Sequence, residues 1–253
     1  MTVRTIFSGR QTSLSLDWFC YRFSANKLLK KYCGLIMKLY FDLLSQPSRA
    51  LLIFLKLNKI AFEPVVVKLA RGEHFSEKFK EINRFGRLPA IDDNGLKLSE
   101  SVAIFRYIVA KNPELIADNW YPKDLTERAK VDEYLEWQHL GTRVGCAGYV
   151  KTVLMIPLSK WNYKLNTKKV EASQGVLKKT LDNLERIWLK DTTKPFLATQ
   201  EISFADILAS CEIDTLPITD IDPFEGRPNL AVNYWSFQRF QLIFNLTYRN
   251  GTI

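Results

Sequence analysis

The segment 43–49, which reads Leu-Leu-Ser-Gln-Pro-Ser-Arg, constrains the fold of this chain more than any other. It lies between a strand-like run at 38–42 and an apolar, helix-forming run at 50–57. Proline suits the first helical position, because the N–H that it lacks would be unpaired there. Ser45 therefore precedes a helix N-terminus, where free N–H groups and the helix dipole favour a bound anion or thiolate. On this segment alone, the interpretation that Ser45 only caps the helix is preferred.

The first half of the chain alternates between strand-like and helical segments. In order, we expect a strand at 38–42, a helix at 47–57, a strand at 62–68, a short helix at 76–83, a hairpin of 88–92 with 96–98, and a helix at 100–111. The β-branched run in the second strand predicts that this strand is buried. Asn94-Gly95 between two apolar runs predicts a tight hairpin turn. A strand–helix–strand unit requires a parallel pair, so we predict an α/β domain with a mixed sheet.

The second half of the chain shows helical periodicity throughout. Asp124 with Glu127, and Ser203 with Asp206, have the spacing of capping boxes at helix starts. Four apolar residues at helical spacing mark a core stripe; they are Leu177, Leu181, Leu184 and Trp188.

We place an extension at 1–36, a first domain at 37–116, a linker at 117–123, an all-helical domain at 124–244 and a tail at 245–253.

Composition excludes several classes of protein. Apolar residues make up 47% and charged residues 25% of the chain, as in ordinary globular domains, and no apolar run approaches a membrane span. The four cysteines lie far apart without a C-x-x-C pair, which argues against a disulfide framework and for a reducing compartment. With two histidines and scattered cysteines, we expect no metal site.

Positive charge is concentrated at the N-terminal end. Residues 1–36 carry six basic side chains and one acidic, which is +5 of the formal net charge of +9. The remainder is mildly basic and has no basic stripe interleaved with aromatics, so we expect no binding to nucleic acid. The composition of 1–36 fits either a disordered extension or a mitochondrial transit segment. We therefore expect a cytoplasmic protein, or a mitochondrial one if this segment directs transit.

Six segments, in this order and at this spacing, resemble the theta class of the cytosolic glutathione transferases. They are 43–49, 71–74, 87–90, 99–104, 131–139 and 224–228. The likeness runs from about residue 37 to about residue 230. It implies a thioredoxin-like N-terminal domain with a mixed four-stranded sheet, an all-α C-terminal domain, glutathione as co-substrate and a homodimer.

The resemblance assigns Ser45 the role of the catalytic serine. Its hydroxyl would donate a hydrogen bond to the sulfur of glutathione and so favour the thiolate, which is the strong nucleophile. The adjacent helix N-terminus would add to this effect. Gln46 would help to position the thiol.

The remaining parts of glutathione also find partners by resemblance. Leu88 and Pro89 match a turn in which a cis proline exposes the Leu88 backbone to the cysteinyl group; an ordinary trans proline is the alternative. Glu100 would bind the γ-glutamyl ammonium, and Ser101, with the N–H groups of the helix start, its carboxylate. The alternative is that Ser99 or Ser101 only caps that helix.

His74 and Arg87 would face the glycine carboxylate, the alternative for His74 being an exposed loop histidine. Arg143 follows the segment 137–139 by about one helical turn and matches a theta-class arginine that reaches the active site. There it would contact the thiolate or a leaving group. The alternative is that Arg143 lies on a solvated helix face.

The end of the chain departs from the family pattern. Theta-class enzymes continue into a helix that covers the active site, whereas residues 230–244 are aromatic-rich and weakly amphipathic, and the chain ends at 253. The cover helix is therefore expected to be absent or replaced, which bears on the electrophile pocket and on water exclusion.

We predict an enzyme that directs the glutathione thiolate at alkyl halides, epoxides or activated alkenes, with peroxide reduction as a side activity. The alternative is a non-catalytic glutathione-site binding or interaction module on the same fold, favoured by the tail and opposed by the retained Ser45. A thiol–disulfide reductase would need cysteine at position 45. The expected partners are glutathione, electrophilic small molecules and a second copy of the chain, without nucleic acid or membrane.

Overall fold

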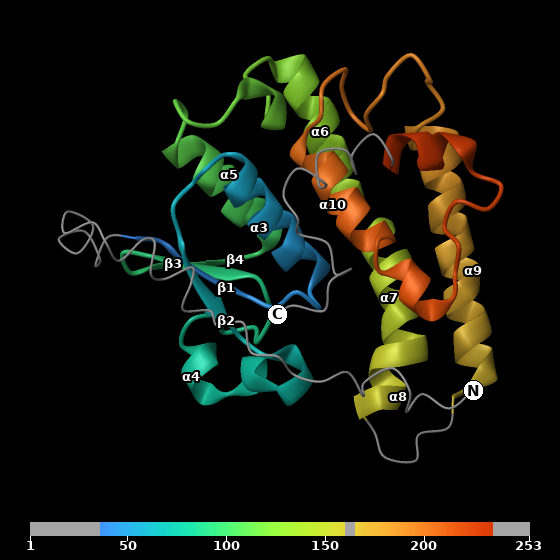
Figure 1. The fold of residues 1–253 in the computed structure, drawn as a ribbon, viewed down its shortest axis with the longest axis horizontal. Helices are drawn as coiled ribbons and strands as arrows, with labels where there is room; N and C mark the ends of the chain where they lie inside the picture. The colour runs from blue at the N-terminus through green and yellow to red at the C-terminus, as the bar shows by residue number, and fades with distance from the viewer. Residues whose placement is uncertain (1–35, 160–164, 235–253) are drawn as a thin grey trace, which may run out of the picture.

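The structure, a computed structural model, describes residues 36–159 and 165–234. Three predicted segments fall largely or wholly outside the described residues. They are the extension at 1–36, of which only residue 36 is described, most of the segment at 230–244, and the tail at 245–253. In Figure 1 a sheet with its flanking helices forms one part of the molecule, and a group of helices forms the other. The predicted order, an α/β domain followed by an all-helical one, is confirmed.

Four strands form one mixed sheet in the order β2-β1-β3-β4. They are β1 (Lys38–Phe41), β2 (Glu63–Val66), β3 (Ala90–Asp93) and β4 (Leu96–Ser99). β1 is parallel to β2 and antiparallel to β3, which is antiparallel to β4. Asn94 and Gly95 join β3 to β4 with φ of 55° and 91°, the positive values that a two-residue hairpin requires. The predicted mixed sheet and hairpin are confirmed.

The predicted burial of the second strand is wrong. β2 lies at the edge of the sheet, and Glu63, Pro64 and Val66 are exposed. Val67, just beyond the strand, is buried against Phe79. A run of valines does not distinguish an edge strand from a central one, because β-branched residues fit the pleated surface of both.

Three helices complete the first domain. α3 (Gln46–Leu57) and α5 (Ser101–Lys111) lie on one face of the sheet, and the short α4 (Glu77–Lys80) lies on the other (Figure 1). Phe54 of α3 meets Phe105 of α5 and Phe204 of the helical domain edge-on, with ring centroids 5.0 and 5.5 Å apart. α3 is thus covered by the sheet on one side and by the second domain on the other, which explains its continuous apolar run.

In its described residues, up to 159 and from 165 to 234, the second domain contains three principal helices and a series of short turns. The principal helices are α6 (Leu125–Trp137), α9 (Thr167–Asn183) and α10 (Phe204–Ile213). π-helical turns interrupt or extend them as η5 (Arg143–Ala147), η6 (Lys151–Met155) and η7 (Leu184–Trp188), with α7 (Gly148–Val150) and α8 (Ile156–Ser159) between. The predicted core stripe is confirmed, since Leu177, Leu181 and Leu184 are buried and Trp188 packs beside them.

A buried capping box begins α10. The Ser203 side chain accepts a hydrogen bond from the helix backbone, while Asp206 accepts from the N–H and hydroxyl of Ser203 at 2.9 and 3.1 Å. The other oxygen of Asp206 accepts from the Leu197 N–H at 2.9 Å. The predicted box is therefore confirmed, and it also anchors the preceding loop to α10. α10 in turn packs along α3.

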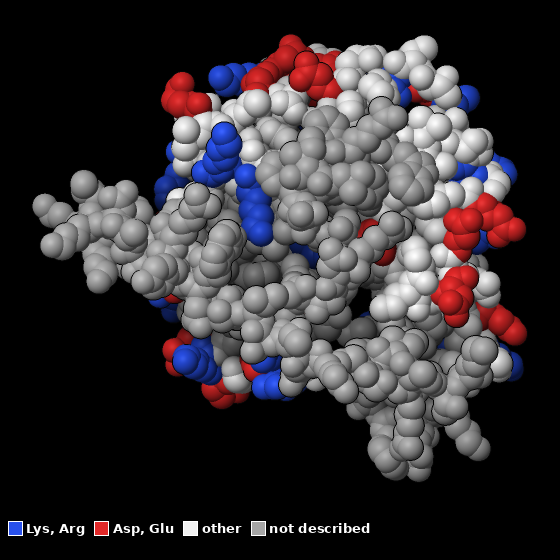
Figure 2. Space-filling model, viewed as in Figure 1, with Lys and Arg blue, Asp and Glu red and all other residues white. Residues whose placement is uncertain are grey.

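On the face shown in Figure 2, basic and acidic side chains both occur among the described residues. None of the helices within 36–159 and 165–234 has both the length and the apolar character needed to cross a bilayer.

Candidate active site

The sheet register brings several chain segments to one edge of the sheet, the edge formed by the strand ends and not by the outer strand β2. β1, β2 and β4 end at this edge and β3 begins there, because Phe41 pairs with Val66, and Ala90 pairs with Tyr40 and Ser99. Eight of the nine predicted site residues lie just beyond these strand ends. Ser45 and Gln46 follow β1, His74 follows β2, Arg87, Leu88 and Pro89 precede β3, and Glu100 and Ser101 follow β4.

Ser45 is the N-cap of α3 and is only 7% exposed. Its Oγ donates a hydrogen bond to the Leu88 carbonyl oxygen at 3.3 Å and accepts one from the Ser48 N–H at 3.4 Å. Both distances are at the long end of the range for hydrogen bonds, so both bonds are weak. Ser45 therefore does cap the helix, and because both bonds are weak, its hydroxyl can turn to a stronger acceptor at small cost. Gln46, half-buried, is the first residue of the helix.

The Leu88–Pro89 peptide bond is cis, as predicted. The buried side chain of Asn83 stabilises the turn that precedes this bond. It donates to the Arg87 carbonyl oxygen at 2.6 Å and accepts from the Phe85 N–H at 3.0 Å. The Arg87 side chain is exposed. Sequence reasoning did not identify Asn83, because an asparagine that satisfies a turn has no signature beyond its residue type.

His74 lies half-buried in the turn η3 (Glu73–Phe75), with its ring against that of Phe75 at a centroid distance of 3.8 Å. The alternative of a freely exposed histidine is therefore wrong. Burial lowers the pKa of His74 below its usual value, and the nearby Asp42 carboxylate opposes that shift. A Cβ on Gly86 would lie 2.9 Å from the His74 carbonyl oxygen. This close approach places the His74 turn against the residue that precedes Arg87.

Glu100 occupies the N-cap of α5 with φ of 68° and ψ of 113°. A positive φ is unfavourable for a residue with a Cβ, and such strain is concentrated at functional sites. Ser101 begins the helix and is buried. Because Glu100 occupies the N-cap, the alternative in which Ser99 or Ser101 is the capping residue is wrong. The Glu100 side chain itself makes no hydrogen bond to the helix. The N–H groups in the first turn of α5 have no partner within the helix, so the start of this helix can bind an anion.

Arg143 lies apart from this sheet edge, at the start of η5. Its Nε pairs with a carboxylate oxygen of Glu212 on α10 at 2.5 Å. Glu212 is 1% exposed, and burial raises the pKa of its carboxyl, an effect that Arg143 and Arg49 oppose. The alternative of a solvated helix face is therefore wrong for Arg143. Arg143 is connected to the Ser45 turn through α10, which carries Glu212, and through the guanidinium of Arg49, which binds the backbone of α10 and of Leu43.

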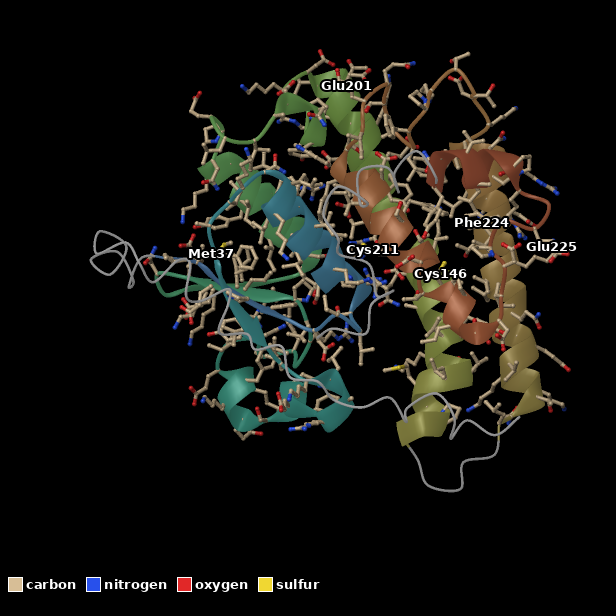
Figure 3. The ribbon with its side chains drawn as sticks, in the orientation of Figure 1. Met37, Cys146, Glu201, Cys211, Phe224 and Glu225 are labelled. Atoms are coloured by element: carbon tan, nitrogen blue, oxygen red, sulfur yellow. The ribbon has the colours of Figure 1, made fainter. Side chains whose placement is uncertain are left out.

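Arg49, which is in the segment 43–49, is a second residue that sequence reasoning left without a role. Its guanidinium donates to the Leu43 carbonyl oxygen at 2.8 Å and to the carbonyl oxygen of Cys211 on α10. Figure 3 labels Cys211 where α10 passes the first domain. The signal for Arg49 was its place one helical turn after Ser45, while nothing in the sequence pointed to Glu212.

The two cysteines in the described ranges, Cys146 and Cys211, are free and buried (Figure 3). Burial raises the pKa of the Cys211 thiol to about 12 and raises that of Cys146. Neither thiol is therefore an activated nucleophile. Across 36–159 and 165–234, no three His, Cys, Asp or Glu side chains are grouped so that they could hold a metal ion.

Two family models match the chain. One is described as the N-terminal domain of glutathione S-transferase and matches residues 37–110, and the other is described as its C-terminal domain and matches residues 149–235. The chain is similar to glutathione S-transferase T1 of Arabidopsis thaliana, with 42% identity over 184 residues, 73% of this chain and 74% of the relative. It is also similar to glutathione S-transferase theta-1 of Mus musculus, with 41% identity over 201 residues, 79% of this chain and 81% of the relative.

A solved structure agrees with these relatives. A human theta-class glutathione transferase in complex with the glutathione conjugate of 1-menaphthyl sulfate matches with a TM-score of 0.76 and 36% identity, over 81% of this chain and 82% of that one. The matched sequence includes both the sheet edge and the helical domain that packs on α3. The chain belongs to the glutathione transferase family and, within it, to the theta class.

Proposed function

We propose that Ser45 is the residue that activates glutathione, by donating its hydroxyl hydrogen to the sulfur and stabilising the thiolate. Glutathione conjugation itself follows from membership of the family. The observation that carries the proposal is the position of Ser45 Oγ, at the N-terminus of α3 and 3.3 Å from the Leu88 carbonyl oxygen. A cysteinyl group held by the Leu88 backbone brings its sulfur beside this hydroxyl.

The energetics of one such donor are sufficient. A hydrogen bond to a charged group contributes about 1.5–3 kcal/mol, which corresponds to a fall of roughly one to two units in the thiol pKa. A free thiol titrates near 8.5, so the bound thiol would titrate at about 6.5–7.5 and a substantial fraction would be ionised near neutral pH. The thiol proton leaves to solvent, and the thiolate attacks the electrophilic carbon. It then displaces a leaving group that departs with its bonding electrons, opens an epoxide whose oxygen takes a proton from solvent, or adds to an activated alkene whose neighbouring carbon takes a proton from solvent.

The remaining site residues orient the tripeptide. Glu100 pairs with the γ-glutamyl ammonium, and Ser101 with the first turn of α5 receives its carboxylate. His74 and Arg87, held together by the close approach at Gly86, bind the glycine carboxylate. Fixing both ends of glutathione determines where its sulfur lies, which is the entropic part of the catalysis.

The proposed electrophiles are alkyl halides, epoxides and activated alkenes, with peroxide reduction as a side activity. The human relative holds a conjugate derived from a sulfate ester, which is consistent with substitution at carbon. Gln46 is proposed to position the thiol, and Arg143 to act on the thiolate or leaving group once its guanidinium turns from Glu212. We further propose a cytoplasmic homodimer, which gel filtration with light scattering and subcellular fractionation would test.

The decisive experiment is an ultraviolet difference titration of bound glutathione in the parent, Ser45→Ala and Ser48→Ala. Ser48 is a matched control, because its Oγ is buried on the same helix without a hydrogen-bond partner. We expect the thiolate band to titrate one to two units below free glutathione in the parent and Ser48→Ala, and to return upward in Ser45→Ala. Binding without a lowered titration in the parent would favour the non-catalytic module.

A further inference from the structure

Asp42 directly follows β1 and is linked to two separate parts of the site. Its Oδ1 accepts a hydrogen bond from the Leu44 N–H at 2.8 Å, and its Oδ2 accepts one from the Leu69 N–H at 2.7 Å. Its carbonyl oxygen accepts from the Ser45 N–H at 3.0 Å. Three backbone donors from two chain segments therefore converge on one residue.

The first of these segments is the turn that carries Ser45. The bond to the Leu44 N–H spans two residues and forms an Asx turn, a common local role of aspartate. The Ser45 N–H bond closes the same turn just before α3 begins. Local turn formation accounts for these two bonds, but it does not account for the bond to Leu69, which is 27 residues away.

The second segment is the one that carries His74. Leu69 begins the turn η2 (Leu69–Arg71), which continues through Gly72 into η3. Backbone bonds from Gly72 to Leu69 and from Phe75 to Gly72, at 3.0 and 2.9 Å, tie the two turns together. The Glu73 carboxylate accepts from the Lys68 N–H at 2.8 Å and closes the unit. A shift of Leu69 is therefore transmitted to His74.

We infer that Asp42 is a positioning residue that couples the glycine end of glutathione to its sulfur, by fixing the His74 turn relative to the Ser45 turn. The inference rests on the proposed function, because it takes Ser45 and His74 as the residues at those two ends. Binding energy from a remote part of a substrate then supports the reaction at its centre. The Asp42 carboxylate also raises the pKa of His74 and so opposes the lowering caused by burial.

Asparagine at position 42 is the informative substitution. Its side chain has one acceptor oxygen in place of two, so it can hold Leu44 or Leu69 but not both. A second variant, Leu69→Pro, removes the other end of the same bond and leaves the carboxylate intact. Proline is tolerated at the first position of a helical turn, and the preceding Lys68 has the extended backbone that proline requires.

The test compares kcat for glutathione with kcat for γ-glutamylcysteine, which lacks the glycine that His74 would bind, in the full chain. We expect the parent to turn over glutathione about tenfold faster or more, the size of one charge-assisted hydrogen bond. In Asp42→Asn and in Leu69→Pro the ratio of the two kcat values should fall towards one, because only the glutathione reaction uses the coupling. A variant that merely destabilises the fold would slow both substrates equally.

Asp92→Asn is the matched control. Asp92 also accepts a backbone N–H, from Gly95 at 2.9 Å, but it lies at the opposite end of the sheet, opposite Lys38. It should retain the parental ratio. A parental ratio near one, or an unchanged ratio in both variants, would overturn the inference. Failure of the proposed function is seen separately, as a Ser45→Ala protein that still lowers the thiol titration.

Discussion

The guanidinium of Arg49 donates to the carbonyl oxygen of Cys211, and through this bond α3, whose N-cap is Ser45, is fixed to the helical domain. The same guanidinium donates to the Leu43 carbonyl oxygen at 2.8 Å, within the turn that leads to Ser45. One side chain therefore ties the turn that carries Ser45 to α10. The position of the proposed glutathione sulfur site depends in this way on a contact between domains.

Replacing Arg49 by methionine should lower both stability and activity. Two hydrogen bonds from a charged donor are lost, each worth about 1.5–3 kcal/mol, although packing of the methionine offsets part of the loss. Urea denaturation would give the free energy of unfolding, and kcat/KM for glutathione would give the effect on the site. Arg49→Lys, which retains the charge without the planar fork, should lie between. Parental kcat/KM in Arg49→Met would show that the turn holds its position without this residue.

Removing Arg143 should make stability strongly dependent on pH. Burial already raises the pKa of Glu212 above its unfolded value, so the folded state keeps a proton that the unfolded state has lost. Stability from this group is therefore lost as pH rises through the folded pKa. In Arg143→Ala the folded pKa rises further, and the buried carboxylate loses its partner at a cost of about 3 kcal/mol. Unfolding free energies at pH 5 and pH 8 should differ more in the variant than in the parent.

The double variant Arg143→Ala, Glu212→Gln is the control for that measurement. Without a carboxyl at position 212, the additional pH dependence should disappear. An equal loss of stability at both pH values in Arg143→Ala would mean that Glu212 is not the titrating group.

Two helical glycines should respond in opposite directions to substitution by alanine. A Cβ on Gly145 would lie 2.4 Å from the hydroxyl oxygen of Thr180 on α9, whereas one on Gly175 would meet no atom of the described residues within 4 Å. Gly175→Ala should stabilise the protein by about 1 kcal/mol, because glycine is a poor helix former. Gly145→Ala should destabilise it by about 1–3 kcal/mol through overpacking. Thermal and urea unfolding would measure both, and a stabilising Gly145→Ala would contradict the close packing of η5 on α9.

Alanine at Gly86 should affect glutathione binding more than alanine at Gly95. Both glycines have positive φ, 58° and 91°, so both substitutions strain the backbone by about 1 kcal/mol. Only at Gly86 would the Cβ also meet a backbone atom, the His74 carbonyl oxygen at 2.9 Å. We expect KM for glutathione to rise several-fold in Gly86→Ala and to stay near parental in Gly95→Ala. Equal KM values in the two variants would show that the His74 turn does not contribute to binding the glycine end of glutathione.

Local chemistry explains which parts of the fold could be predicted from sequence. The Asn94-Gly95 turn and the Ser203–Asp206 box are specified by residues close together in the chain, and both were predicted correctly. In the segment 43–49, proline and apolar spacing alone predicted that a helix begins shortly after Ser45, and α3 begins at Gln46. The cis bond at Pro89 came from the family resemblance, since most X–Pro bonds are trans.

Long-range chemistry explains what could not be predicted. The burial of β2 depends on strand order, which a run of valines does not encode. The partners of Asp42, Arg49 and Arg143 lie 27, 162 and 69 residues away, so their hydrogen bonds and ion pair follow only from the assembled fold. The π-helical turns η5, η6 and η7 could not be predicted either, because an apolar period of 3.6 residues does not distinguish them from an α-helix.

The outer strand β2 has a further consequence, for association between chains. Pro64 has no N–H to offer, so another strand approaching the rim of the sheet meets an incomplete row of donors. Glu63 beside it presents a charge that such a strand would have to bury. The three valines that follow, at 65–67, would otherwise be an aggregation-prone segment. The first two residues of this strand therefore protect the open rim of the sheet against extension by a second polypeptide.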